Sequence, residues 1–357
     1  MRGILLCLLF AVFTSLAQER RPPPPLPDFP DYPAPTELNA TSSGEVYFSS
    51  VTPGDCKWLI LADQILLATT VKAQLFLPAG ASATQPVPAM VIIHGSGGIL
   101  PSREIAYGKW MASQGIAGLV VNSYAARGVT EQTPYGLRVA IVSDADEATD
   151  AYGALKFLNQ HPAINPNKIG VMGFSYGGMA TRAALDERIH QNLAADVAPF
   201  ALHLDYYGPC HFDLKTAETT GAALFSLRGA QDKSNDLETC ARLENSLREA
   251  GSAVGSTIFP TAGHGWEMAT PRQFVETLNP APCKQVLMDN GDWQLDGQTI
   301  AVPSLNSREQ KYQFRLGLLG QMKQSCMSNG YIMGQDKNTH ELSQRLLLQY
   351  TTTYLLN

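Results

Sequence analysis

Residues 168–178, KIGVMGFSYGG, join a short apolar run to a serine that lies between glycines. A continuous apolar run of this length, closed by a glycine, is typical of a strand buried on both faces of a parallel sheet. The residues that follow, 176–189, predict a helix. A tight turn from strand to helix brings backbone close to backbone, and glycine at positions 173 and 177 removes the Cβ atoms that would collide there. The stretch therefore predicts a strand, a sharp turn at Ser175 and a helix.

The chain on both sides of this stretch alternates between apolar strands and amphipathic helices. The other predicted strands are 66–77, 89–95, 117–124, 200–207, 222–228 and 255–259. The other predicted helices are 104–115, 144–158, 237–249 and 339–355. Strands and helices in alternation predict an α/β fold with a doubly wound, mostly parallel sheet and helices on both faces. Residues 266–336 do not follow this alternation, so we expect them to form a C-terminal insertion before the last helix.

The N-terminal residues predict a signal peptide and a spacer. Arg2 precedes an apolar run, Ile4–Ala17, which is shorter than the roughly 20 residues that a membrane-spanning helix needs. Residues 18–40 are rich in proline and predict an extended, polyproline-like spacer. We therefore expect residues 1–17 to be cleaved and residues 41–357 to form one domain. The mature protein would be secreted or periplasmic, with no segment integral to a membrane.

Composition and motifs exclude several classes of function. The chain has 26 Lys and Arg against 32 Asp and Glu, a formal net charge of −6, which does not suit a nucleic-acid-binding protein. It is 45% hydrophobic and 16% charged, unlike a disordered polyelectrolyte. No HExxH, no close CxxC pair and no GxxxxGK[ST] motif occurs, so the sequence predicts neither a metal site nor a cofactor.

Cleavage of the signal peptide would remove Cys7 and leave five cysteines. An odd number leaves at least one thiol unpaired or paired with another molecule. In an oxidising compartment we expect Cys210 to pair with Cys240 and Cys283 with Cys326. The alternative is that all five are buried thiols, because spacing does not determine connectivity.

Ser175 is the candidate nucleophile, and a serine hydroxyl needs a base to accept its proton. A glycine-flanked histidine, His264, follows the last predicted strand on a loop and is the candidate base. His211, on the loop after Cys210, is the second candidate. The alternative for residues 173–177 is an ordinary glycine-rich turn.

The base in turn needs a carboxylate that orients its ring. Asp232 lies just past the end of the predicted strand 222–228 and is the candidate acid. Asp236 and Glu238 also precede His264, but they fall at the start of the next predicted helix, where they suit capping and surface roles.

Acyl transfer further requires two N–H donors for the negative oxygen of the tetrahedral intermediate. Residues 94–98, HGSGG, end an earlier predicted strand and allow close approach of the backbone to a ligand. We expect the amides of Ser96 and Tyr176 to be the oxyanion-hole donors, with that of Gly97 as an alternative. The loop is not a dinucleotide fingerprint, because Leu100 stands where the third glycine would be.

In this order, HGSGG, GFSYGG, GAQD and AGHG resemble the motifs of the α/β-hydrolase superfamily. More narrowly, residues 66–265 resemble the dienelactone hydrolase family, with further similarity in NSYAARG, LKFLNQHPAIN and KIGVMGFSYGG. The resemblance implies an α/β-hydrolase fold and a Ser175, Asp232 and His264 triad. It also raises Arg127 as a ligand for a substrate carboxylate, although a role in closing its own loop explains this arginine as well. The namesake enzymes have a cysteine nucleophile where this chain has Ser175.

These observations predict a secreted serine hydrolase that cleaves small carboxylic esters or lactones through an acyl-enzyme. One alternative is a serine peptidase of the prolyl oligopeptidase-like type. Another is a non-catalytic α/β-hydrolase-like binding protein, for which a broken triad would be typical.

Overall fold

An eight-stranded sheet forms the centre of the computed structural model, which describes residues 24–62 and 67–357. Its spatial order is β1-β2-β4-β3-β5-β6-β8-β9. The strands are β1 Gly44–Thr52, β2 Leu67–Phe76, β3 Val87–Ile93, β4 Ala117–Val121, β5 Ile164–Phe174, β6 Leu202–Tyr206, β8 Ala223–Gly229 and β9 Val254–Phe259. β2 pairs antiparallel with β1 and β4, and from β4 to β9 every neighbouring pair is parallel. The predicted mostly parallel α/β sheet is therefore confirmed.

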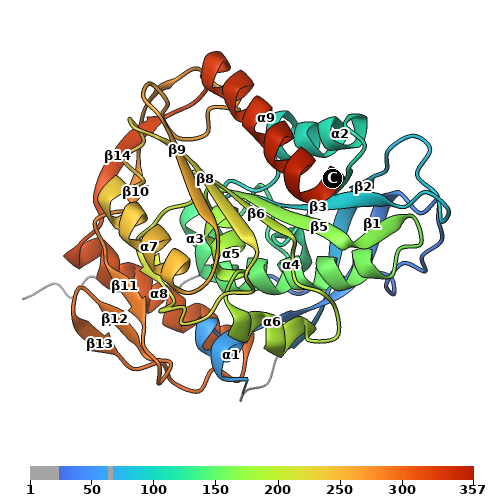
Figure 1. Ribbon diagram of the computed structural model, residues 1–357. Coiled ribbons are helices and arrows are strands. Elements are labelled where there is room, and N and C mark those ends of the chain that lie inside the picture. The colour runs from blue at the N-terminus through green and yellow to red at the C-terminus, as the bar shows by residue number, and fades with distance from the viewer. Residues whose placement is uncertain (1–23, 63–66) are drawn as a thin grey trace, which may run out of the picture.

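Helices cover both faces of this sheet (Figure 1). One face packs against α4 Asp144–Asn159, α5 Tyr176–Ala183 and α6 Glu187–Ala194, together with the short α1 Cys56–Leu61. The other face packs against α2 Ala106–Ser113 and α9 Lys337–Thr351. The helix α7 Leu237–Glu249 lies beside β9 at the edge of the sheet. Alternate residues of β3 enter the two cores, as a strand buried on both faces requires.

Most predicted elements are present with shifted ends, and one is divided. The helix expected over residues 176–189 is two helices, α5 and α6. Asp186 separates them, because its side chain accepts a hydrogen bond from the Arg188 amide and caps α6. The predicted elements do not include β1 or α1.

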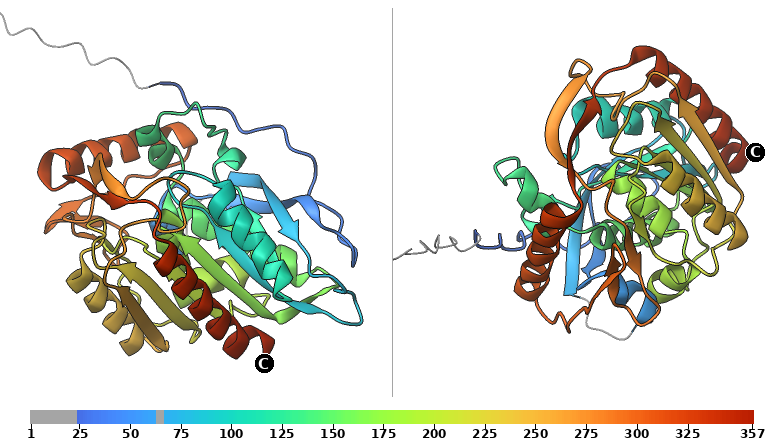
Figure 2. Two further views of the ribbon diagram at one scale, coloured as in Figure 1. Left: turned by 90° about the horizontal axis from the view of Figure 1, so that it is seen from above. Right: turned by 90° about the vertical axis from the view of Figure 1, so that its left-hand side faces the viewer.

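The expected insertion carries its own secondary structure. β10 Gln273–Asn279 pairs antiparallel with β14 Ser328–Met333. A small sheet joins β7 Phe212–Asp213, β11 Gln285–Leu287, β12 Trp293–Leu295 and β13 Gln298–Ile300. The helix of the insertion is α8 Arg308–Ser325, whereas β7 and α3 Tyr135–Ile141 come from earlier parts of the chain. Figures 1 and 2 show the insertion elements β10 to β14 and α8, in orange and red, gathered on one side of the molecule.

The described part of the proline-rich segment, residues 24–40, contains no helix or strand and lies against the domain. The Arg308 guanidinium lies 3.8 Å from the centre of the Phe29 ring, and the Thr36 amide donates to the carbonyl of Tyr47. The predicted signal peptide, residues 1–17, is outside the described residues. Among the described residues, no helix is both long enough and apolar enough to cross a membrane.

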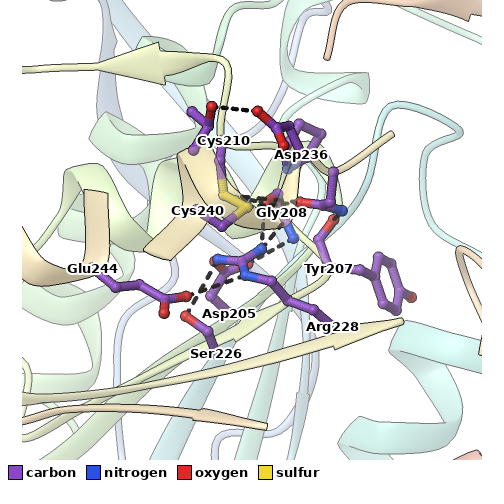
Figure 3. Close-up of a disulfide and its surroundings, with 12 residues drawn as sticks. Asp205, Tyr207, Gly208, Cys210, Ser226, Arg228, Asp236, Cys240 and Glu244 are labelled. Carbon is purple, nitrogen blue, oxygen red and sulfur yellow. Dashed lines mark hydrogen bonds and ion pairs between the residues drawn. A yellow bond between two sulfur atoms is a disulfide. The ribbon is translucent and has the colours of Figure 1, made fainter. Parts of the chain in front are cut away.

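Two cysteine pairs lie at disulfide distance, as predicted. Cys210 bonds Cys240, and Cys283 bonds Cys326. Figure 3 shows the first of these bonds beside the buried side chains of Arg228 and Asp205. Cys56 is buried and not in a disulfide.

Candidate active site

Ser175 lies at the sharp turn between β5 and α5, with φ 55° and ψ −110°. Two glycines make this turn possible. A Cβ at Gly173 would overlap the carbonyl of Gly177, and a Cβ at Gly177 would lie 2.7 Å from the carbonyl oxygen of Ile93. The turn therefore presents the serine above the carboxyl ends of the strands, as the spacing of the motif predicts.

The structure brings together the three residues predicted to form the triad. His264 Nε2 lies 2.8 Å from Ser175 Oγ, and His264 Nδ1 lies 2.7 Å from Asp232 Oδ2. Each follows a different parallel strand, namely β5, β8 and β9, and parallel strands end at the same edge of a sheet. This arrangement has the geometry that a nucleophile, a base and an acid orienting the base require.

The insertion holds His264 in place. The His264 amide donates to the carbonyl of Ile332 at 2.8 Å, and the Gly334 amide donates to the carbonyl of His264 at 2.9 Å. The ring of His264 also packs edge-on against the rings of Tyr207 and Tyr331. The position of the imidazole thus depends on β14 as well as on the central sheet.

The Asp232 carboxylate is buried and fully hydrogen-bonded. Oδ1 accepts from the amide and the hydroxyl of Ser234 at 2.9 and 2.6 Å, and Oδ2 accepts from Asn235 Nδ2 at 2.9 Å. Burial alone would raise the pKa of Asp232, but the charge of His264 and the hydrogen bonds from His264 and Ser234 outweigh it and hold the pKa below the ordinary value. Asp232 is therefore poised to stay ionised beside the imidazole.

The candidate oxyanion loop, residues 95–98, follows β3, and side chains contact the carbonyl groups of all four residues. His94 Nδ1 lies 2.9 Å from the oxygen of Gly95, and Tyr124 donates to that of Ser96 at 2.9 Å. Arg138 donates to the oxygen of Gly97 at 3.0 Å, and Arg103 donates to that of Gly98 at 3.4 Å. Within the described residues, no backbone hydrogen bond uses the amides of Ser96 or Tyr176. The loop is thus fixed through its carbonyls while these two N–H groups stay available.

A cavity of about 290 Å³ opens beside Ser175 and His264. Its walls are mainly apolar and come from α5, the small sheet and α8; they include Met179, Phe212, Trp293, Leu318, Leu319 and Met322. The sequence does not predict this wall, because α8 and most of the small sheet belong to the insertion, which shows no alternation of strands and helices. His211, the second candidate base, also lines the cavity, but Ser175 bonds His264.

Other residues named from the sequence lie away from the reacting groups. Arg127 is 1% exposed and bonds Asp146 and Asp150, so it closes its own loop region and does not line the cavity. Asp236 and Glu238 are exposed at the start of α7. Within residues 24–62 and 67–357, no group of three or more His, Cys, Asp or Glu side chains is arranged to hold a metal ion.

The model of the dienelactone hydrolase family matches residues 71–285, more than half of the chain. A comparison with curated proteins found no match.

Similar solved structures include three hydrolases. Thermogutta terrifontis esterase 2 is 17% identical, over 61% of this chain and 84% of that one, with a TM-score of 0.44. A dienelactone hydrolase-like promiscuous phosphotriesterase from metagenomic libraries is 14% identical, over 79% and 99%, with a TM-score of 0.46. The Pyrococcus horikoshii acylaminoacyl peptidase is 18% identical, over 64% of this chain and 38% of that one, with a TM-score of 0.44.

Proposed function

The chain belongs to the dienelactone hydrolase family, and from this we propose that it hydrolyses carboxylic esters through an acyl-enzyme on Ser175. The observation that carries the proposal is the unbroken chain of hydrogen bonds from Ser175 Oγ through His264 to Asp232. A serine outside such a chain is a weak nucleophile at neutral pH.

In the proposed first half-reaction, Ser175 Oγ attacks the ester carbonyl carbon while His264 Nε2 takes the hydroxyl proton. Asp232 stays ionised and stabilises the imidazolium. The amides of Ser96 and Tyr176 donate to the negative oxygen of the tetrahedral intermediate. When the intermediate collapses, the carbon–oxygen bond to the alcohol breaks, and His264 returns the proton to the leaving alcohol.

In the proposed second half-reaction, a water molecule replaces the alcohol. His264 takes a proton from this water as its oxygen attacks the acyl carbon. The acyl bond to Ser175 then breaks, the serine oxygen recovers the proton, and the carboxylic acid leaves. A lactone would follow the same steps, with its alcohol still attached to the acyl group.

The walls of the cavity favour an ester with an apolar acyl or alcohol group. Met179, Leu318 and Met322 would bury such a group, and each buried methylene contributes about 0.8 kcal/mol. The volume of about 290 Å³ lies near the lower end of the pockets that take small organic molecules. We therefore propose a small-molecule ester as the substrate.

We also propose that the protein acts in a secreted or periplasmic compartment. The two disulfides support this, because disulfides persist in oxidising compartments. The signal-like residues 1–17 support it independently.

The test is to label the mature protein with a fluorophosphonate probe and to locate the adduct by peptide mass spectrometry. A short-chain p-nitrophenyl ester assay runs beside it. We expect the adduct on Ser175, ester turnover by the wild type, and neither in a folded S175A variant. Turnover by S175A at the wild-type rate would contradict the proposal, and a folded wild type that neither labels nor turns over would favour the non-catalytic binding protein.

A further inference from the structure

Asn235 bonds one oxygen of the candidate acid Asp232, and Ser234 bonds the other. Asn235 Nδ2 donates to Asp232 Oδ2 at 2.9 Å, the same oxygen that lies 2.7 Å from His264 Nδ1. Nδ2 also donates to the carbonyl of Tyr207 at 3.2 Å. One carboxylate oxygen therefore receives two N–H donors, one from the imidazole and one from Asn235.

The oxygen of the Asn235 amide is held by a second buried group, the guanidinium of Arg228. Its Oδ1 accepts from Arg228 Nη1 at 3.1 Å and lies 3.5 Å from the sulfur of Cys240. Arg228 in turn bonds Asp205 at 2.9 Å and Glu244 at 3.2 Å. Figure 3 shows Arg228 between these two acids, next to the disulfide.

These partners determine which way the Asn235 amide points. The Asp232 carboxylate and the Tyr207 carbonyl only accept hydrogen bonds, so they require the NH₂ group. The guanidinium of Arg228 only donates, so it requires the oxygen. Rotating the amide by 180° would place its oxygen against the two acceptors and its NH₂ group against the donor Arg228.

Burial makes this arrangement rigid. Asn235 is 5% exposed, Arg228 1% and Asp205 0%. A buried polar network whose members are all hydrogen-bonded holds its side chains in one geometry, because any displacement leaves a polar group unpaired away from water. The disulfide adds a covalent link between the β6–β7 connection and α7, which flank Asn235.

We propose that Asn235 is a positioning residue for the reaction proposed above, holding the Asp232 carboxylate in the orientation that His264 requires. The proposal rests on the proposed function of Ser175, Asp232 and His264. Asn235 touches neither substrate nor the reacting serine. It acts through Asp232 in two ways, by fixing where Oδ2 lies and by drawing negative charge from that oxygen.

The second effect gives a signature in the pH profile. Without the Asn235 donor, Asp232 Oδ2 would carry more negative charge toward the imidazole. The imidazolium form of His264 would then be better stabilised. Because the free enzyme needs neutral His264, the acidic limb of kcat/KM would move to higher pH.

The experiment compares wild type, N235A, N235L and the control K233A, whose exposed side chain lies in the same loop. For N235A we expect kcat on a short p-nitrophenyl ester to fall about 10-fold or more, with KM changed less than about twofold. The acidic limb should move to higher pH in N235A and in N235L, which is close to asparagine in size but offers Asp232 no donor. K233A should match the wild type.

Unchanged kcat and an unchanged acidic limb in folded variants would overturn the proposal, even if their melting temperature fell. If N235A does not fold, N235L decides on the same criteria, because it preserves size and Arg228 Nη1 keeps its bond to the carbonyl of Gly208 at 2.7 Å. The proton NMR signal of the His264 Nδ1–H group, which bonds Asp232, tests Asn235 without turnover. An inactive, unlabelled wild type would therefore contradict the proposed function, whereas an identical Nδ1–H signal in all variants would contradict the role of Asn235.

Discussion

Ser175 combines an unusual backbone conformation with an accessible hydroxyl. A non-glycine residue at φ 55° and ψ −110° costs of order 1–3 kcal/mol, so surrounding contacts must stabilise it. The Ser175 amide donates to the carbonyl of Tyr206 at 2.8 Å, and the Gly178 amide donates to the carbonyl of Ser175 at 2.9 Å. Both peptide groups of the serine are thus held, and its side chain is directed toward His264.

Substitutions of single residues test whether Asp232, and not its neighbour Asp236, is the acid that orients His264. D232N would keep the size of the side chain but remove the charge that stabilises imidazolium, so we expect kcat to fall about 10³–10⁴-fold. D236N should retain wild-type kcat, because Asp236 is exposed and bonds only Thr239 among the described side chains. Ester kinetics on both folded variants measure this, and equal losses in the two would contradict the assignment.

Glu267 predicts a pH dependence of stability. Its carboxyl group is buried and accepts a hydrogen bond from the Tyr207 hydroxyl at 2.8 Å. Burial raises the pKa of Glu267 to about 7, although this hydrogen bond lowers it. The unfolded chain ionises Glu267 near pH 4.5, so its contribution to stability is fully present below that pH and is lost as pH rises through 7. E267Q cannot ionise and keeps a side-chain oxygen for Tyr207.

We therefore expect E267Q to be more stable than wild type at pH 8, by about 3 kcal/mol, and equally stable at pH 4.5. Urea unfolding at the two pH values measures the difference. A stability difference that did not change with pH would show that Glu267 ionises in the folded protein as it does in the unfolded chain.

At the scale of elements, loop 95–98 depends on segments that lie far away in the sequence. Tyr124, from the connection after β4, and Arg138, from α3, each bond one of its carbonyls. Tyr135, at the start of α3, also hydrogen-bonds the hydroxyl of Ser96 at 2.8 Å. The oxyanion role proposed for loop 95–98 requires donors that are already oriented before the reaction, and α3 supplies part of that orientation.

R138A tests the contribution of α3. Loss of the bond to Gly97 should let the loop move, so we expect kcat to fall about 10-fold with little change in KM, because the donors act on the transition state. The matched control is R242A, an exposed arginine on α7 that pairs with Glu238. Steady-state ester kinetics give both constants, and a rise in KM alone would show that Arg138 serves substrate binding instead.

At the scale of the whole molecule, the insertion completes a site that the central sheet begins. The sheet presents Ser175 and Asp232, while β14 holds the loop of His264 and α8 lines the cavity. The Cys283–Cys326 disulfide ties the β10–β11 connection to the end of α8. Stability of the insertion and geometry of the site are therefore linked.

Removing this disulfide should destabilise the protein. It closes a separation of 43 residues, and for C283A/C326A we expect the free energy of unfolding to fall by about 2–4 kcal/mol. Urea unfolding of wild type and variant, each with and without reductant, measures this. A variant as stable as oxidised wild type would contradict the prediction.

Much of the fold and of the candidate site could be predicted because the signals are local. The run 168–178 predicts its strand, turn and helix from consecutive residues, and the other buried strands likewise end in recognisable loops. Because parallel strands end at one edge, Ser175, Asp232 and His264 could be expected to meet there. The helix predicted over 176–189 shows where local signals fail. Its helical pattern looks continuous in the sequence, but Asp186 caps a second helix there.

The sequence by itself determined the alternation of strands and helices, the turn at Ser175 and the order of the candidate site residues, because each depends on neighbours along the chain. Only the tertiary structure decided that α8 lines the cavity, that β14 holds His264 and that Asn235 bonds Asp232. It also showed that Arg127 forms salt bridges with Asp146 and Asp150. The physical reason is that hydrogen bonds and packing between distant segments depend on how the elements dock, and docking leaves no periodic signal in the sequence.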